Sequence, residues 1–233
     1  MQDLQSTEIQ VQENNRHFFN FSFFKVNPKW KWITNTEKQE ATKQIESVLK
    51  NCRIKFRVYS TVGLRDDTDF LLWFASDSID KIQDMIATVN QTLFGKCISP
   101  SHVYLSSTRP SIYAAGSRGH GWLAREEQKK FVIVYPFIKT REWYLLPLEK
   151  RKEMMDEHIE VGKKYPEVTL NTTYSFGIDD QDFMLAFETD SLEKFQDLIM
   201  DLRETKVSEY VKVDTPMIVC VKKEIVDIIH SLG

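Results

Sequence analysis

The chain has 233 residues, and 42% of them are hydrophobic, which suffices for a buried core in one large domain or two smaller ones. Lys and Arg number 31 against 34 Asp and Glu, and this balance argues against a nucleic-acid partner. The apolar runs are far shorter than the roughly 20 residues that span a bilayer, and the polar N-terminus is unlike a signal peptide. We therefore expect a cytoplasmic protein with no membrane span.

The first part of the chain predicts the order β, α, β, β, α, β. Residues 1–16 are polar and are expected to form a flexible arm. A strand at HFFNFSFFKV is followed by a polar segment with helical spacing and by a hairpin at RVYSTVGLRDDTDFLLWFA. A second helix begins near Asp77, and a closing strand lies near HVYLS.

The second part repeats this order after a linker rich in Gly, Pro, Ser and Arg, STRPSIYAAGSRGHGWLAREEQ. Its elements are a strand at KKFVIVYPFI, a helix at LEKRKEMMDEHIEVGKKY, a hairpin at LNTTYSFGIDDQDFMLAFE, a helix from Asp190 and a strand at PMIVCVK. We place the boundary near Gly119, which gives one repeat over residues 17–118 and another over residues 119–233.

An internal repeat supports this division. Shifting the chain by 113 residues aligns Asp69 to Ile86 with Asp182 to Ile199, and 10 of these 18 positions are identical. The same shift places Trp30 on Trp143. The expected fold class is therefore α+β, with two fused ferredoxin-like repeats. Each sheet carries helices on one face and must cover its other face, so two fused copies can cover each other.

His158 is the clearest difference between the repeats. It occupies the position of Ile45, on or beside the apolar stripe of its helix, and Gly162 one turn later replaces Leu49. A single histidine on an apolar face is more often a core residue than a ligand. The replacement of an aliphatic residue nevertheless favours a ligand, and Gly162 would leave room for a large flat group. The other four histidines show no zinc-binding spacing with His158.

Tyr135 and Lys139 form a second difference, because they replace Ser22 and Val26 of the first repeat. They share a strand face with Phe137, so a redox-capable phenol and a cation would face one surface. The simpler interpretation is a tyrosine at the edge of the core and a lysine that reaches water.

The segment YPFIKTREWYLLPLEKRKEMMDEHIEVGKKYP, with NTTYSFGIDDQDFMLAFE after it, resembles the chlorite dismutase and coproheme decarboxylase superfamily. The resemblance implies a dimeric α+β barrel subunit, assembled as a homopentamer, with haem b or coproheme in the second repeat. It makes His158 the proximal iron ligand and Trp143 a residue that lines the pocket. Arg118 and Arg125 are the candidates that meet a propionate, with Arg141 as an alternative.

Within this superfamily, Tyr135 and Lys139 match residues of the decarboxylases. The resemblance implies that hydrogen peroxide oxidises the iron, that a Tyr135 radical takes hydrogen from a propionate, and that Lys139 assists at a second propionate. Leu170 aligns with the distal arginine of chlorite dismutases and with a glutamine of some decarboxylases, so Asn171 or a loop residue is the candidate substitute donor. Val207 aligns with the carboxylate that pairs with the proximal histidine in chlorite dismutases.

Coproheme decarboxylation to haem b is therefore the favoured function, with an iron porphyrin and hydrogen peroxide, or a small oxyanion, as partners. The alternatives are a chlorite dismutase or peroxidase-like haem enzyme and a non-catalytic haem-binding protein. A ferredoxin-like doublet that binds no haem, and serves oligomerisation or small-molecule binding, is a further alternative.

Overall fold

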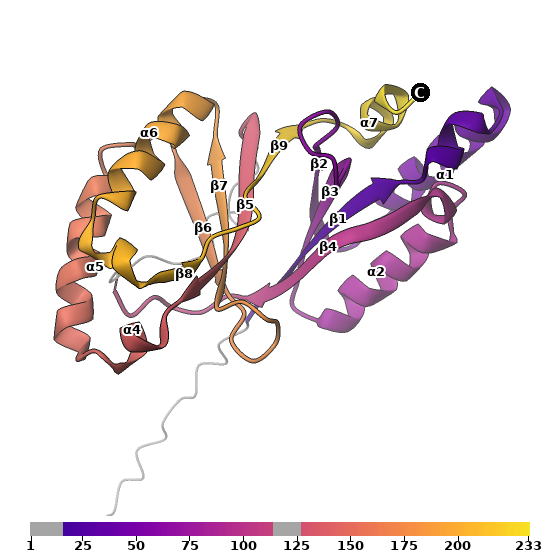
Figure 1. Ribbon diagram of the computed structural model, residues 1–233. Coiled ribbons are helices and arrows are strands. Elements are labelled where there is room, and N and C mark those ends of the chain that lie inside the picture. The colour runs from indigo at the N-terminus through magenta and orange to yellow at the C-terminus, as the bar shows by residue number, and fades with distance from the viewer. Residues whose placement is uncertain (1–15, 114–126) are drawn as a thin grey trace, which may run out of the picture.

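The computed structural model describes residues 16–113 and 127–233, and each half contains a four-stranded antiparallel sheet with helices on one face (Figure 1). The second half has one further short strand, Val211–Val213. The first half comprises β1 (Phe18–Val26), α1 (Asn35–Lys50), β2 (Lys55–Ser60), β3 (Phe70–Ser76), α2 (Ile79–Gln91) and β4 (Ile98–Ser107). The second comprises β5 (Phe131–Lys139), α4 (Arg141–Leu145), α5 (Leu148–Gly162), β6 (Thr169–Tyr174), β7 (Phe183–Thr189), α6 (Leu192–Arg203), β8 (Val211–Val213), β9 (Ile218–Lys222) and α7 (Ile225–Ser231).

The strand pairings close a ring. The first half has the order β4-β1-β3-β2, and the second has the matching order β9-β5-β7-β6. Their edges join where β2 pairs with β9 and β4 pairs with β6. The predicted α+β class and the two ferredoxin-like repeats are confirmed, and the two sheets form one barrel.

The inner faces of the two sheets form the central core of the barrel. Phe19, Phe21 and Phe23 of β1 point inward, and Val132 and Val134 of β5 meet them from the other half. The indole of Trp73 stacks on Phe21 with ring centroids 4.9 Å apart. Alternation along the strands sends the remaining side chains outward, to the layer of helices.

One ion pair joins the two halves inside this barrel. Arg57 of β2 donates to Glu188 of β7 across 2.7 Å, and both side chains are almost fully buried. Asn171 of β6 donates to the other oxygen of Glu188 across 2.7 Å. A buried charge pair is tolerated only when such contacts satisfy its atoms, so the pair links β2, β6 and β7. Asn171 therefore points into the barrel.

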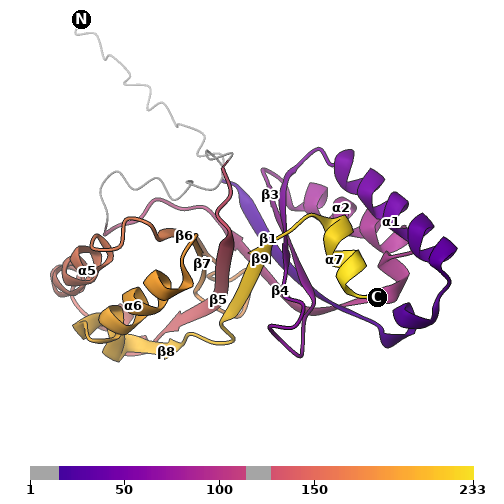
Figure 2. The ribbon, with the colours of Figure 1, turned by 90° about the horizontal axis from the view of Figure 1, so that it is seen from above.

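Helix α7 covers the outer face of the first half, although it follows the last strand of the second half (Figure 2). Its residues Ile225, Ile228 and Ile229 are buried in one cluster with Phe24 and Phe70 of the sheet and with residues of α1. The sequence did not predict this helix or its position.

The repeat is not uniform at β2 and β6. Phe56 pairs with Phe74, and Leu170 pairs with Phe187, so β6 follows β2 with an offset of 114 rather than 113 (170 − 56 = 114). The turns after these strands contain Gly63 and Gly177, both at positive φ, with the same offset. The offset of 113 found for the flanking segments does not hold here, because one residue is inserted before β6 and one is removed after its turn.

Several predictions concern residues outside the described part of the chain. They include residues 1–15 of the arm predicted over residues 1–16, the boundary near Gly119, and the side chains of Arg118 and Arg125. These stay predictions. Among the described residues, no helix is both long and apolar enough to cross a membrane.

Candidate functional site

His158 lies on the inward face of α5. It shares this face with Met154, which packs against Trp143 and Val207. Nδ1 of His158 lies 3.5 Å from Oγ1 of Thr205, a long contact. The Thr205 hydroxyl already donates to the carbonyl of Leu202 across 2.7 Å, so toward His158 its oxygen can only accept. A hydrogen bond between the two would therefore run from Nδ1–H to Oγ1, and this tautomer leaves the lone pair of Nε2 available for a metal.

The His158 imidazole is neutral near pH 7. Burial lowers its pKa to about 4, and the nearby positive charge of Lys139 acts in the same direction. Neutral imidazole is the form that binds metal ions. His158 is thus prepared as a ligand without first having to lose a proton.

Lys139 and Trp143 lie beside this histidine. The Lys139 ammonium is 4.4 Å from the ring centroid of Trp143 and donates to the carbonyl oxygen of Val207 across 3.3 Å. Burial lowers the pKa of Lys139 to about 8. Trp143 is 2% exposed and holds α4 against the Tyr210 ring. The structure therefore brings together three of the predicted site residues.

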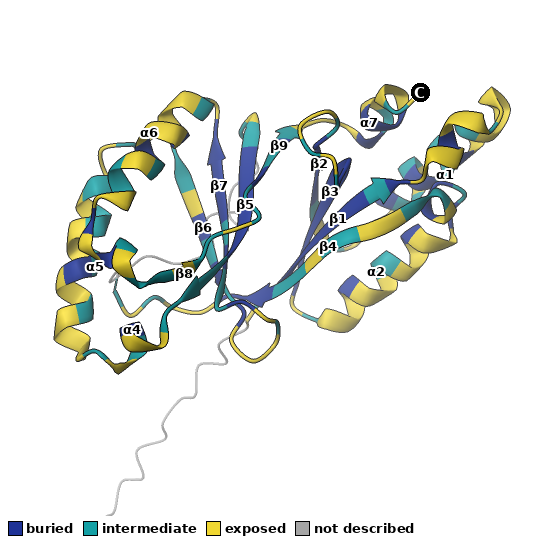
Figure 3. Ribbon diagram, viewed as in Figure 1, coloured by how far each residue is buried: buried dark blue, intermediate teal, exposed yellow. Residues whose placement is uncertain are grey.

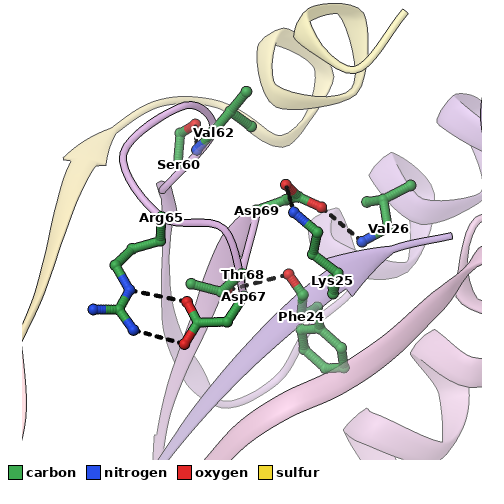
Figure 4. A network of polar contacts seen from close by, with 9 residues as sticks. All are labelled: Phe24, Lys25, Val26, Ser60, Val62, Arg65, Asp67, Thr68 and Asp69. Carbon is green, nitrogen blue, oxygen red and sulfur yellow. Dashed lines mark hydrogen bonds and ion pairs between the residues drawn. The ribbon is translucent and has the colours of Figure 1, made fainter. Parts of the chain in front are cut away.

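Asp182 fixes the backbone on which Lys139 stands. Its carboxylate accepts from the Lys139 N–H across 2.8 Å and from the Tyr144 hydroxyl across 2.7 Å. Asp69 makes the matching bond in the first half, to the Val26 N–H across 2.8 Å, and there Lys25 takes the second oxygen (Figure 4). Both halves therefore share the bond from a strand N–H to this aspartate, whereas the second donor is Lys25 in the first half and Tyr144 in the second.

Tyr135 and Leu170 lie on the same helix-facing side of the second sheet, apart from the His158 cluster. Tyr135 is 4% exposed and stacks on Phe187, near Phe195 and Leu198 of α6. Burial raises its pKa above the ordinary tyrosine value. Leu170 is 43% exposed on β6. Its neighbour Asn171 points into the barrel, so the expectation that Asn171 could serve as a distal donor is wrong.

The outer faces of the two sheets differ in exposure. Phe24, Phe70 and Leu72 of the first half are 1–2% exposed beneath α1 and α7. Their counterparts Phe137, Phe183 and Leu185 are only partly buried. Figure 3 shows β3 buried along its length, whereas its counterpart β7 has intermediate positions at Phe183 and Leu185. The second half thus offers a partly exposed apolar face, on which the ring centroid of Phe137 lies 5.4 Å from the Lys139 ammonium.

Gly162 ends α5, one turn beyond His158. A Cβ added there would meet no atom within 4 Å, so the space next to this residue is open. The predicted role of Gly162, to admit a flat group, is compatible with this space and stays a prediction.

Sequence reasoning missed Thr205 and Asp182, and the repeat could have revealed both. Thr92 and Thr205 occupy matching positions, and each hydroxyl donates to the carbonyl three residues before it. Only in the second half does this oxygen also face a histidine. Val207, the position expected for a carboxylate partner, packs against Trp143, and its backbone oxygen receives Lys139.

Replacing Asp182 by Ala should release Tyr144 and the Lys139 N–H, with a cost of about 1–3 kcal/mol in the free energy of unfolding. We expect an altered fluorescence spectrum that disappears in a Trp143→Phe background, because α4 would shift. Asp69→Ala removes the matching bond and is the control. If it changes the Trp143-dependent signal equally, Asp182 does not specifically hold the site.

Comparisons with known proteins agree with the sequence pattern. The model of the chlorite dismutase family matches residues 36–223. A coproheme decarboxylase from Mycolicibacterium smegmatis is 33% identical over 162 residues, which are 68% of this chain and 69% of that protein.

Solved structures share the fold. A mutant chlorite dismutase from Candidatus Nitrospira defluvii has a TM-score of 0.85 at 21% identity, covering 93% of this chain and 95% of that one. The same enzyme in complex with imidazole has a TM-score of 0.84 at 21% identity, covering 93% and 94%. A putative chlorite dismutase has a TM-score of 0.81 at 22% identity, covering 94% and 100%. The family match and the curated relative together show that the chain belongs to the chlorite dismutase family.

Proposed function

We propose that the chain binds an iron porphyrin between α5 and the second sheet, where Nε2 of His158 would hold the iron. We further propose that it converts coproheme to haem b with hydrogen peroxide. The observation that carries the proposal is the neutral His158, held by Thr205 and flanked by Lys139 and Trp143 beside an apolar sheet face. The 33% identity to a protein named coproheme decarboxylase supports the reaction.

The residues present fit such a group. An iron porphyrin needs a nitrogen ligand for its iron, an apolar surface for its ring and cations for its carboxylates. His158 supplies the nitrogen. The partly exposed side chains of Phe137, Phe183 and Leu185 supply apolar surface, and Lys139 supplies a cation.

Bound iron would supply the peroxide chemistry, in which each hydrogen peroxide takes up two electrons from one propionate side chain. The balance is one propionic acid side chain and one peroxide to one vinyl group, one carbon dioxide and two waters. Tyr135 would lose its hydroxyl hydrogen atom and regain one from the propionate. Its burial keeps the phenol protonated at neutral pH, so a hydrogen atom is available.

Lys139 would act at the carboxylate end. Its pKa of about 8 means that the amine carries a proton at pH 7 and can release it at little cost. An ammonium held at the rim of an apolar face can bind a carboxylate or return a proton to it.

Chlorite or general peroxide chemistry is the second candidate, because the solved structures with this fold include chlorite dismutases. Leu170 argues against it, since its side chain cannot hold an oxyanion and Asn171 faces the barrel. The homopentamer implied by the resemblance and the cytoplasmic location expected from the sequence pattern stay predictions.

Haem b added to the protein should give a shifted Soret band that is lost in His158→Ala and regained when imidazole is supplied. His102→Ala, in the first half, is the control and should bind normally. Because the His158 pKa is about 4, the protonated ring predominates only below that value, so ligation should persist as the pH falls from 7 to 5. No spectral shift in the wild type would contradict the haem proposal.

Peroxide added to the coproheme complex should convert two propionates in succession, and each step should remove one carbon dioxide and two hydrogen atoms. Mass spectrometry of the porphyrin measures these losses. We expect Tyr135→Phe to bind coproheme but to form no vinyl product, whereas Tyr104→Phe, in the first half, should react like the wild type. Unchanged coproheme in the wild type would favour a haem-binding protein without this activity. Oxygen release from chlorite would favour the second candidate instead.

A further inference from the structure

Arg151 lies on the same face of α5 as His158. The two residues are seven positions apart, which is two helical turns and about 10 Å along the axis. Met154 and Met155 lie between them on this face and pack in the cluster that contains Trp143. Arg151 itself is half-buried, whereas its neighbours Lys150 and Lys152 are exposed.

At least one N–H group of the Arg151 guanidinium has no acceptor among the described residues. Nη1 donates to the hydroxyl of Tyr113 across 3.3 Å. Nε is buried and has no hydrogen-bond partner among the residues that the structure describes. A buried N–H without an acceptor costs free energy, because it has lost its bond to water. The atom therefore points to an acceptor that the described chain does not provide.

Other buried or half-buried cations of the described chain have recognisable partners. Arg57 binds Glu188, and Arg65 binds Asp67. The counterpart of Arg151 in the first half is Lys38, which lies over the ring of Trp30. In the second half, the cation over the Trp143 ring is Lys139, so Arg151 does not make the cation–π contact that Lys38 makes in the first half.

We propose that Arg151 binds a carboxylate of the porphyrin, as a specificity-determining residue on the α5 side of the site. The inference rests on the proposed function, since the carboxylate is a propionate of the bound porphyrin. A guanidinium suits this task because its N–H groups can form two parallel bonds to one carboxylate. Tyr113, which packs against Trp143, accepts from Nη1, and Nε is left without an acceptor among the described residues.

The test compares the affinity of the protein for haem b with its affinity for haem b dimethyl ester, which has no charged carboxylate. Arg151→Met should weaken haem b binding about 10-fold or more, as for loss of a charged hydrogen bond, and leave ester binding unchanged. Lys152→Met removes the same charge from the exposed side of α5 and should affect neither ligand. Arg151→Lys, which keeps the charge but loses the fork, should lie between.

Each other outcome contradicts the inference. If Arg151→Met weakens both ligands equally, the residue supports the fold of α5 rather than a carboxylate. If it weakens neither, Arg151 does not contact the porphyrin. If Arg151→Met does not fold, the test uses Arg151→Lys instead. An affinity of this variant for haem b equal to that of the wild type would overturn the proposal. If the wild-type protein binds neither haem b nor its ester, the proposed function is contradicted. If it binds both and the variants bind both with wild-type affinity, only the proposed role of Arg151 is contradicted.

Discussion

The structure depends on the covering of two sheet faces in each half. A four-stranded sheet with apolar residues on both sides cannot leave either side in water without a large cost. The two inner faces solve this by packing against each other around Phe21 and Trp73, and the pairs β2–β9 and β4–β6 seal the ring. The outer faces need separate solutions, and there the halves diverge.

In the first half, the C-terminal helix α7 completes the cover, and its isoleucines join the core above Phe24 and Phe70. In the second half, α5 and α6 cover the sheet only in part, and the matching aromatic residues remain partly exposed. The two copies of one unit therefore differ on their outer faces, since one face is covered by a helix and the other is partly exposed. The partly exposed face is the one proposed to bind the porphyrin.

The site combines inherited and altered residues. Asp182 and Thr205 repeat the structural bonds of Asp69 and Thr92. His158 and Lys139 stand where the first half has aliphatic residues. The altered side chains thus use anchors that were already present, so a histidine and a lysine could be added without new backbone supports.

The family resemblance implied that His158, Lys139 and Trp143 share a site, and the sequence itself was sufficient for the β, α, β, β, α, β order and the two halves. These follow from hydrophobic spacing and from comparison of the repeats, which are properties of neighbouring residues. The docking of α7 on the opposite half was not predictable, because its apolar stripe does not specify which surface it covers. The inward turn of Asn171 was missed for a related reason, since a shift of one residue reverses the faces of a strand. Thr205 was missed because its contact with His158 links segments 47 residues apart.

Hydrogen exchange with and without iron coproporphyrin tests the central claim most directly, because it reports both halves in one experiment. The account predicts slower exchange in α5 and β6 when the porphyrin is added, and unchanged exchange in their counterparts α1 and β2. Protection in α1 and β2, or equal protection in both halves, would contradict the claim that only the second outer face accepts the ligand.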